Sequence, residues 1–423
     1  MEPVYEEDSV IEEVVAGIDV HKKMLAVVVA GPNQTDKQYV RRKFGTTRKE
    51  LRALAAWLGD HQVRQAAMES TAEYWKPVWM ELEPHFQLHL AQARSTTGAK
   101  GRKSDFRDAV RIVNRLRAHD LTLSFVPDAE QREWRQFSRA CAQMTKQHVR
   151  LRNQMECVLE QAQIKLTSVI KDVLGASGRR ILKAIVEGVD DPDKLAALGD
   201  RRLHASERQL SEALDGRVEP VHRTLLKQQF EQLELLEVHL ADIQQRLAKA
   251  MQAHQDAVAR LCRIPGIHPN AAQQMIAEVG VEAAAFPSAG HLCSWVGVCP
   301  GQNESAGVAY GNRSAKGNRS MRRILTQVAW AAVRTKDSYF QGLFHRLVPS
   351  LGVKKAIWAV AHRILRLIWK LLHQKVSYIE HGALAQDPKK QARRKQRLVR
   401  ELRRLGYTVQ LTASPAADAN SVS

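Results

Sequence analysis

Four carboxylates in the N-terminal third of the chain have the types and spacing of a metal site. Asp19 follows the apolar run 14–18, Glu69 follows the short run 63–68, and Asp105 and Asp108 are three residues apart. That spacing places two side chains on one helix face, where like charges are unfavourable unless a cation neutralises them. Such oxygen ligands suit Mg²⁺, or Mn²⁺ in its place, and two ions about 4 Å apart hold both reacting oxygens of a phosphodiester. The pattern therefore indicates metal-dependent chemistry on phosphodiesters.

Each acid also has a simpler interpretation when it is considered alone. An Asp beside a turn is commonly a local hydrogen-bond acceptor, and Glu69 would cap the helix that follows Ser70 and Thr71. Asp105 and Asp108 would pair with neighbouring arginines on a solvated helix face. The joint placement of all four favours the metal site.

The elements that must position these acids form a mixed α/β domain that ends near Pro127. Residues 14–29 contain two β-rich apolar runs around a polar tip, which predicts a hairpin with Asp19 near the end of its first strand. Further strands are expected at 37–44, 63–68 and 87–90, with helices after Thr47, over 74–82 and over 104–117. Strands first, followed by alternating helices, suit a ribonuclease-H-like sheet.

Strand signals vanish over 130–163 and again over 222–254. The second stretch has apolar residues at steps of three and four, which is typical of a coiled-coil seam. Its partner is either the first stretch or the same stretch of a second subunit, and the sequence leaves both open. We divide the chain into an acidic lead (1–13), a catalytic α/β domain (14–127), a helical linker and oligomerisation region (128–257), a mostly helical domain (258–380), and a basic arm with a disordered tail (381–423).

The helical domain opens with a predicted helix, tight hairpin and helix around 261–271, which either binds a phosphate or packs. A small-residue loop, 302–307, contains Ser305, which on sequence alone is most simply a turn residue. Polar and basic residues that suit phosphate contacts follow this loop: Arg313, Lys316, Asn318, Arg319, Arg322 and Arg323.

Composition restricts the partners. A formal net charge of +19 and a pI near 9.9 predict polyanionic partners, either nucleic acid or an anionic membrane surface. No apolar run reaches the roughly 18 residues of a membrane span, and 356–372 carries basic residues at helical spacing, so we expect no membrane association. Nothing resembles a secretion signal, and a cytoplasmic location is expected.

Cysteine usage gives no evidence for zinc. None of the five cysteines forms a Cys-x-x-Cys pair, and His291, Cys293 and Cys299 lack a fourth ligand at a recognisable spacing. Free thiols are the expected state.

Several motifs resemble those of the Asp-Glu-Asp-Asp transposases of the IS110 family, relatives of the pilin-type DNA invertases. The N-terminal motifs are Gly17-Ile18-Asp19-Val20 with Lys22, Met68-Glu69-Ser70-Thr71 with Tyr74-Trp75, and Lys103-x-Asp105-x-x-Asp108-Ala109. The C-terminal motifs are Ile264-Pro265-Gly266-Ile267, Gly297 with Pro300-Gly301, Glu304-Ser305-x-Gly307, Lys316-Gly317-Asn318 and Met321-Arg322-Arg323-Ile324-Leu325. The resemblance covers roughly residues 14–125 and 258–345.

This resemblance implies a RuvC-like domain that holds magnesium with Asp19, Glu69, Asp105 and Asp108, and a second domain in which Ser305 attacks DNA. The product would be a transient 5′-phosphoserine link. It also implies donor and target DNA as substrates, a structured noncoding guide RNA, homodimers or homotetramers, and a nucleoid-associated location in the bacterial cytoplasm.

Three alternatives stay open at this point. A RuvC-like nuclease would cut with metal-activated water and without Ser305, and a site-specific invertase would act without an RNA guide. A basic nucleic-acid-binding dimer would use the carboxylates only structurally.

Overall fold

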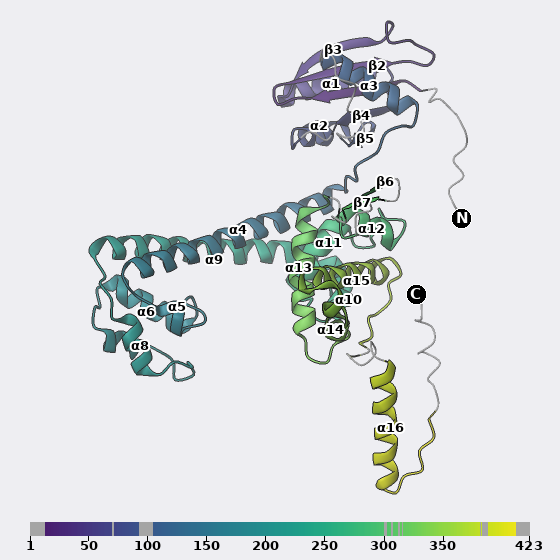
Figure 1. Ribbon diagram of the computed structural model, residues 1–423. Coiled ribbons are helices and arrows are strands. Elements are labelled where there is room, and N and C mark those ends of the chain that lie inside the picture. Colours follow the sequence, from purple (N-terminus) through teal and green to yellow (C-terminus); the bar gives the residue numbers. More distant parts are fainter. Residues whose placement is uncertain are drawn as a thin grey trace. The chain divides into compact units, whose positions relative to one another are not determined.

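The computed structural model describes residues 13–69, 72–92, 105–299, 303–305, 308–311, 314, 316–380, 382 and 388–411 (Figure 1). The chain divides into two compact units, Met1–Pro127 and Asp128–Ser423, which we describe separately. The predicted tail 412–423 lies outside the described residues.

The first unit is built on a five-stranded mixed sheet in the order β3-β2-β1-β4-β5 (Figure 1). β1 pairs antiparallel with β2 and parallel with β4, while β3 and β5 extend the sheet on either side. A short turn closes the predicted β1–β2 hairpin, whereas the parallel β1–β4 pair requires a longer crossover. The sheet is consistent with the expected ribonuclease-H-like fold. Its strands are β1 Val15–Val20, β2 Met24–Ala30, β3 Val40–Gly45, β4 Gln65–Glu69 and β5 Gln87–Ala91.

Helices cover both faces of this sheet. Alternate residues of a strand point to opposite faces, so each strand contributes side chains to two cores. Ile18 of β1 belongs to the core formed with α1 (Arg48–Asp60) and α2 (Trp75–Leu82). Val15 of the same strand packs instead with apolar residues of α3 (Asp105–Arg117) on the other face. The side on which a β1 residue lies therefore decides which helices it meets.

A long helical pair dominates the first part of the second unit (Figure 1). α4 (Ala129–Gln161) and α9 (Pro220–Ala250) run antiparallel: Leu159 shares a core with Leu226, and His148 Nε2 lies 2.9 Å from Glu237 Oε1. Of the two partners that the sequence left open for α9, the structure thus contains the one within the same chain. Short helices share the core at one end of the pair: α5 Leu166–Val169, α6 Ala176–Glu187, α7 Pro192–Ala196 and α8 Glu207–Leu214.

The remainder of the second unit is mostly helical. Its elements are a 3₁₀ turn at Gln252–His254, α10 Gln255–Cys262, α11 Pro269–Val279, α12 Ala289–Val296, β6 Asn303–Ser305, β7 Val308–Gly311, α13 Arg319–Arg334, α14 Tyr339–Leu351, α15 Val353–His373 and α16 Pro388–Arg404. α15 buries its apolar residues against α12, α13 and α14, so the apolar side chains of 356–372 belong to the core of this unit. In the part of the chain that the structure describes, we find no helix with the length and apolar character of a bilayer span.

The predicted hairpin between α10 and α11 packs against α13. Gly266 has a φ of +82°, and a Cβ at this position would lie 2.5 Å from Ala332 N. Only glycine suits both that backbone conformation and that approach. The α10–α11 hairpin thus has a packing role, whatever it also contributes to phosphate binding.

Candidate active site

The register of the sheet places Asp19 and Glu69 at the same edge. Ile18 pairs with Met68 in the parallel β1–β4 ladder, so Asp19 and Glu69 each follow one residue later, at the carboxyl ends of neighbouring strands. Ile18 and Met68 face the core under α1 and α2. By alternation, Asp19 and Glu69 lie on the opposite face, which α3 covers.

Helix α3 contributes the other two predicted acids, because Asp105 and Asp108 both lie in its first turn. The helix lies close to β1 at Gly17, where a Cβ would be 2.4 Å from Ala109 O and 2.7 Å from Val113 Cγ2. Gly17 shares the strand face of Asp19, so this close approach determines how near the first turn of α3 lies to Asp19.

Two basic side chains that the sequence did not single out contact these acids. His21 Nε2 lies 3.0 Å from Asp19 Oδ2 and 3.7 Å from Asp105 Oδ1. Lys43 Nζ donates a hydrogen bond to Asp105 Oδ2 at 3.0 Å. Lys43 is two strands from Asp19 in the same cross-strand row, since Ala26 pairs with both residues. Only the register of β1, β2 and β3 could have revealed this neighbour.

The structure brings Asp19, His21 and Asp105 into one cluster, in which one ligand atom from each lies within 4.8 Å of the others. Glu69 and Asp108 are not members of that cluster, but their charges act on Asp19. Asp108 Oδ1 accepts a hydrogen bond from Arg111 Nη1 at 2.8 Å.

The electrostatics of Asp19 fit a cation site. Asp19 is only 7% exposed, and its Oδ2 accepts no hydrogen bond of good geometry from the described residues. Burial raises the pKa of Asp19, the charge of His21 opposes this, and the charges of Asp108 and Glu69 raise the pKa further. A buried carboxylate oxygen that lies near other carboxylates, and whose contact with His21 lacks good hydrogen-bond geometry, is satisfied by a hard cation. For Asp105, the hydrogen bond from Lys43 lowers the pKa.

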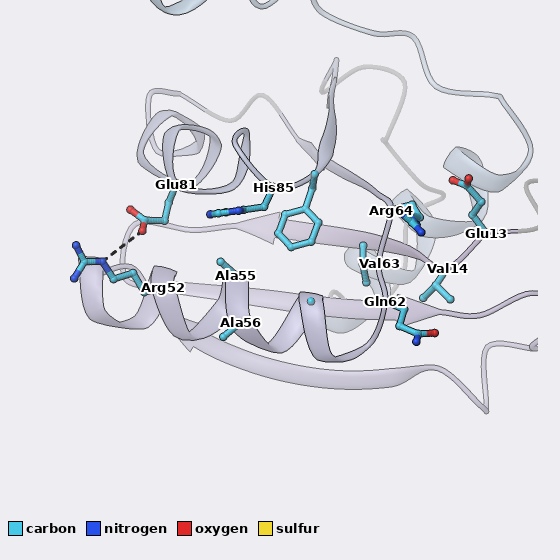
Figure 2. Close-up of a pocket in the computed structure, with 12 residues that line it drawn as sticks. Glu13, Val14, Arg52, Ala55, Ala56, Gln62, Val63, Arg64, Glu81 and His85 are labelled. Atoms are coloured by element: carbon cyan, nitrogen blue, oxygen red, sulfur yellow. Dashed lines mark ion pairs between the residues drawn. The ribbon is translucent and has the colours of Figure 1, made fainter.

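A groove elsewhere in the first unit does not include the predicted acids. It has a volume of about 990 Å³ and is lined by residues of α1 and of the segment after α2, including His85 and Phe86 (Figure 2). Arg52 and Glu81 form an ion pair at its margin, with Arg52 Nε 3.6 Å from Glu81 Oε1.

Ser305 belongs to a two-stranded hairpin in the second unit. It is the last residue of β6 and pairs with Val308 of β7. The side chain of Ser305 lies outside the part of the chain that the structure describes, as does Arg313. Among the other predicted phosphate contacts, Lys316 and Arg319 are exposed.

Arg322 and Arg323, also predicted as phosphate contacts, have partners within the protein. Arg322 Nη1 donates to Gly297 O at 2.9 Å, and its guanidinium lies over the Trp358 ring, 4.8 Å from the centroid. Arg323 Nη2 donates to Gln274 Oε1 at 2.8 Å. These contacts hold α13 to its neighbours, and a DNA contact by either residue stays a prediction.

Asn318 belongs to a buried ionic network that the sequence did not reveal. Its Oδ1 caps α13 by accepting from Met321 N, and its Nδ2 donates to Glu278 Oε2, both at 2.9 Å. Glu278 of α11 has no exposed surface and accepts two hydrogen bonds from Arg139 of α4, at 2.9 and 3.1 Å. Arg135, whose pKa burial lowers to about 10, donates to Glu278 O at 2.6 Å. This network joins α4, α11 and α13.

Two family models match the chain. A transposase model of the Asp-Glu-Asp-Asp type, named for IS110, matches residues 16–164. A model described as transposase of the IS116/IS110/IS902 family matches residues 258–345. A search of curated proteins finds no match.

Proposed function

The chain belongs to the IS110 family of insertion-sequence transposases, and from this premise we propose that it cuts and rejoins DNA strands through a covalent 5′-phosphoserine intermediate. Membership makes it an enzyme that acts on DNA in transposition. The observation that supports the metal-dependent part of this proposal is the convergence of Asp19 and Asp105 at one sheet edge, where Asp19 Oδ2 is buried and has no well-aligned hydrogen-bond donor among the described residues.

In the proposed site, Asp19, Glu69, Asp105 and Asp108 hold Mg²⁺, or Mn²⁺ in its place. A bound cation would stabilise negative charge on the phosphate oxygens and favour loss of a proton from the attacking hydroxyl. The carboxylates of this site come from three elements: β1 and β4 carry one each, and the first turn of α3 carries the other two. Lys43, half-exposed beside Asp105, adds positive charge at the edge where a phosphate would approach.

Ser305 is the proposed nucleophile. Its Oγ attacks phosphorus, the Oγ–P bond forms as the P–O3′ bond breaks, and the proton lost from Oγ is balanced by the one that the 3′ oxygen gains. One phosphodiester replaces another, so the bond energy is kept for rejoining the strands. Arg313, Lys316 and Arg319 would bind neighbouring phosphates, because a serine hydroxyl needs positive charge around its target. The acids and the serine would come together in a homodimer or homotetramer.

We further propose that a structured noncoding RNA selects the donor and target DNA by base pairing. The net charge of +19 supports binding of polyanions in general. Ribonuclease treatment of the purified protein tests this. Loss of site-specific strand exchange, with non-specific DNA binding retained, supports guidance, whereas unchanged site-specific exchange identifies an invertase that needs no guide.

A cleavage and trapping assay separates the recombinase from a metal-dependent nuclease. Protein, any co-purified RNA, Mg²⁺ and nicked junction DNA are mixed, and denaturation-resistant protein–DNA adducts and free cut strands are measured. We expect adducts with wild type and with the control Ser314→Ala, and none with Ser305→Ala or Asp19→Ala. Cutting by Ser305→Ala, but not by Asp19→Ala, would identify a RuvC-like nuclease, and no cutting under any condition would favour a binding protein.

A further inference from the structure

We propose that His21 is a direct ligand of the metal ion, so that the site combines carboxylate oxygens with one imidazole nitrogen and prefers Mn²⁺ to Mg²⁺. The inference rests on the proposed metal site and adds a ligand to the four carboxylates. It also assigns a selectivity, because Mg²⁺ favours oxygen ligands, whereas later divalent ions bind imidazole more readily.

The position of the imidazole is the first argument. His21 Nε2 lies between two carboxylates on different elements, 3.0 Å from Asp19 Oδ2 and 3.7 Å from Asp105 Oδ1. In octahedral coordination at about 2.1 Å, adjacent ligands are about 3 Å apart and opposite ligands about 4.2 Å apart. Ligand atoms of Asp19, His21 and Asp105 that all lie within 4.8 Å of one another fit this geometry after small side-chain adjustments.

The second argument is that the backbone around His21 is held on both sides. His21 N donates to Met24 O at 3.0 Å, which closes the β1–β2 turn. Thr46 Oγ1 donates to Lys22 O at 3.1 Å and ties the same turn to the end of β3. The imidazole therefore extends from a fixed point at the end of β1, and its side chain, 49% exposed, leaves room for water and a phosphate.

The third argument separates His21 from Lys43, the other basic group at the cluster. An ammonium has no lone pair, so Lys43 acts as a counter-ion to Asp105. A neutral imidazole offers one nitrogen lone pair to a metal while its other nitrogen carries the proton. His21 can therefore replace its ionic contact with Asp19 by a bond to the cation that Asp19 itself binds.

The test uses Mn²⁺ as the probe on the full-length protein without DNA. Electron spin echo envelope modulation detects a nitrogen ligand of bound Mn²⁺, and titration calorimetry gives separate Mn²⁺ and Mg²⁺ affinities. The variants are His21→Ala and His21→Gln, the latter in case the smaller side chain perturbs folding. The control is His85→Ala, which removes a histidine of the same unit from the groove beside α1 (Figure 2).

We expect nitrogen modulation in wild type and in His85→Ala, and none in either His21 variant. Mn²⁺ affinity should fall at least about tenfold in the His21 variants, since even the loss of groups that only support ligands costs that much. Mg²⁺ affinity should change much less. Mn²⁺ that binds wild type without nitrogen modulation, and with equal affinity in His21→Ala, would overturn the ligand role. Mn²⁺ binding that Asp19→Asn leaves unchanged would instead overturn the metal site itself.

Discussion

Replacing Gly17 by alanine tests how the fold positions the four acids. The new Cβ would lie 2.4 Å from Ala109 O and 2.7 Å from Val113 Cγ2. Ala109 O is a backbone atom in the second turn of α3, so it cannot rotate away. The helix must move outward as a body, and Asp105 and Asp108 in its first turn move with it.

The size of the effect follows from that contact. Restoring an ordinary separation of about 3.4 Å from 2.4 Å requires α3 to shift by about 1 Å. Overpacking of this kind costs about 1–3 kcal/mol of folding free energy. A displacement of about 1 Å at a catalytic site reduces the rate by roughly 100-fold. DNA cleavage should therefore fall far more than the stability of the fold.

Urea unfolding and single-turnover DNA cleavage measure the two effects. The control is Gly59→Ala in α1, where a Cβ meets nothing within 4 Å. That change should raise stability by about 0.5–1 kcal/mol, because alanine favours a helix over glycine, and should leave cleavage unchanged. If Gly17→Ala unfolded at the wild-type urea concentration and cleaved at the wild-type rate, the β1–α3 contact would not be what positions the acids.

Three further predictions concern charged residues that are buried or half-buried. Burial raises the pKa of Glu278, but its arginine partners outweigh this effect and lower the pKa below the ordinary 4.5. The stabilisation by this network is therefore complete above pH 4.5 and is lost at lower pH, as acid protonates Glu278. Glu278→Gln should lower the free energy of unfolding by about 3 kcal/mol at pH 7 and should make the urea midpoint depend less on acid pH. An unchanged midpoint at pH 7 would mean that the network contributes nothing to stability. Burial raises the pKa of Asp19, so folding disfavours the ionised form of this side chain. Asp19→Asn should therefore raise the urea midpoint at pH 7 when a chelator removes divalent metal ions, and a lower midpoint would contradict this. Arg322→Ala removes the bond to Gly297 O and the contact with Trp358, and should cost about 1–3 kcal/mol; unchanged stability with weaker DNA binding would assign Arg322 to DNA instead.

Local patterns were sufficient to predict the elements that carry the site. The two apolar runs around a polar tip form the β1–β2 hairpin, and Asp19 lies in the first strand as expected. Within the segment predicted as a basic arm, Pro388–Arg404 form the helix α16. These features depend on residues close in sequence, where periodicity and turn chemistry determine the structure.

Features that depend on distant residues could not be predicted in the same way. Lys43 reaches Asp105 only because β3 and β1 share a register with β2, and one residue of slippage would turn Lys43 to the other face. Glu278 meets Arg139 across 139 positions of sequence. A charged residue in a helix is usually solvated, so no local signal marks Glu278 as buried.

The central claim is that Ser305 becomes covalently linked to a 5′ phosphate, and peptide mapping of the trapped adduct tests it most directly. The adduct is digested with nuclease and protease, and tandem mass spectrometry locates the remaining nucleotide. The account predicts a phosphodiester-linked nucleotide on the peptide that contains Ser305, and no adduct when Asp19 is replaced by Ala. A nucleotide on another residue, or cleaved DNA with no adduct on any peptide, would contradict it.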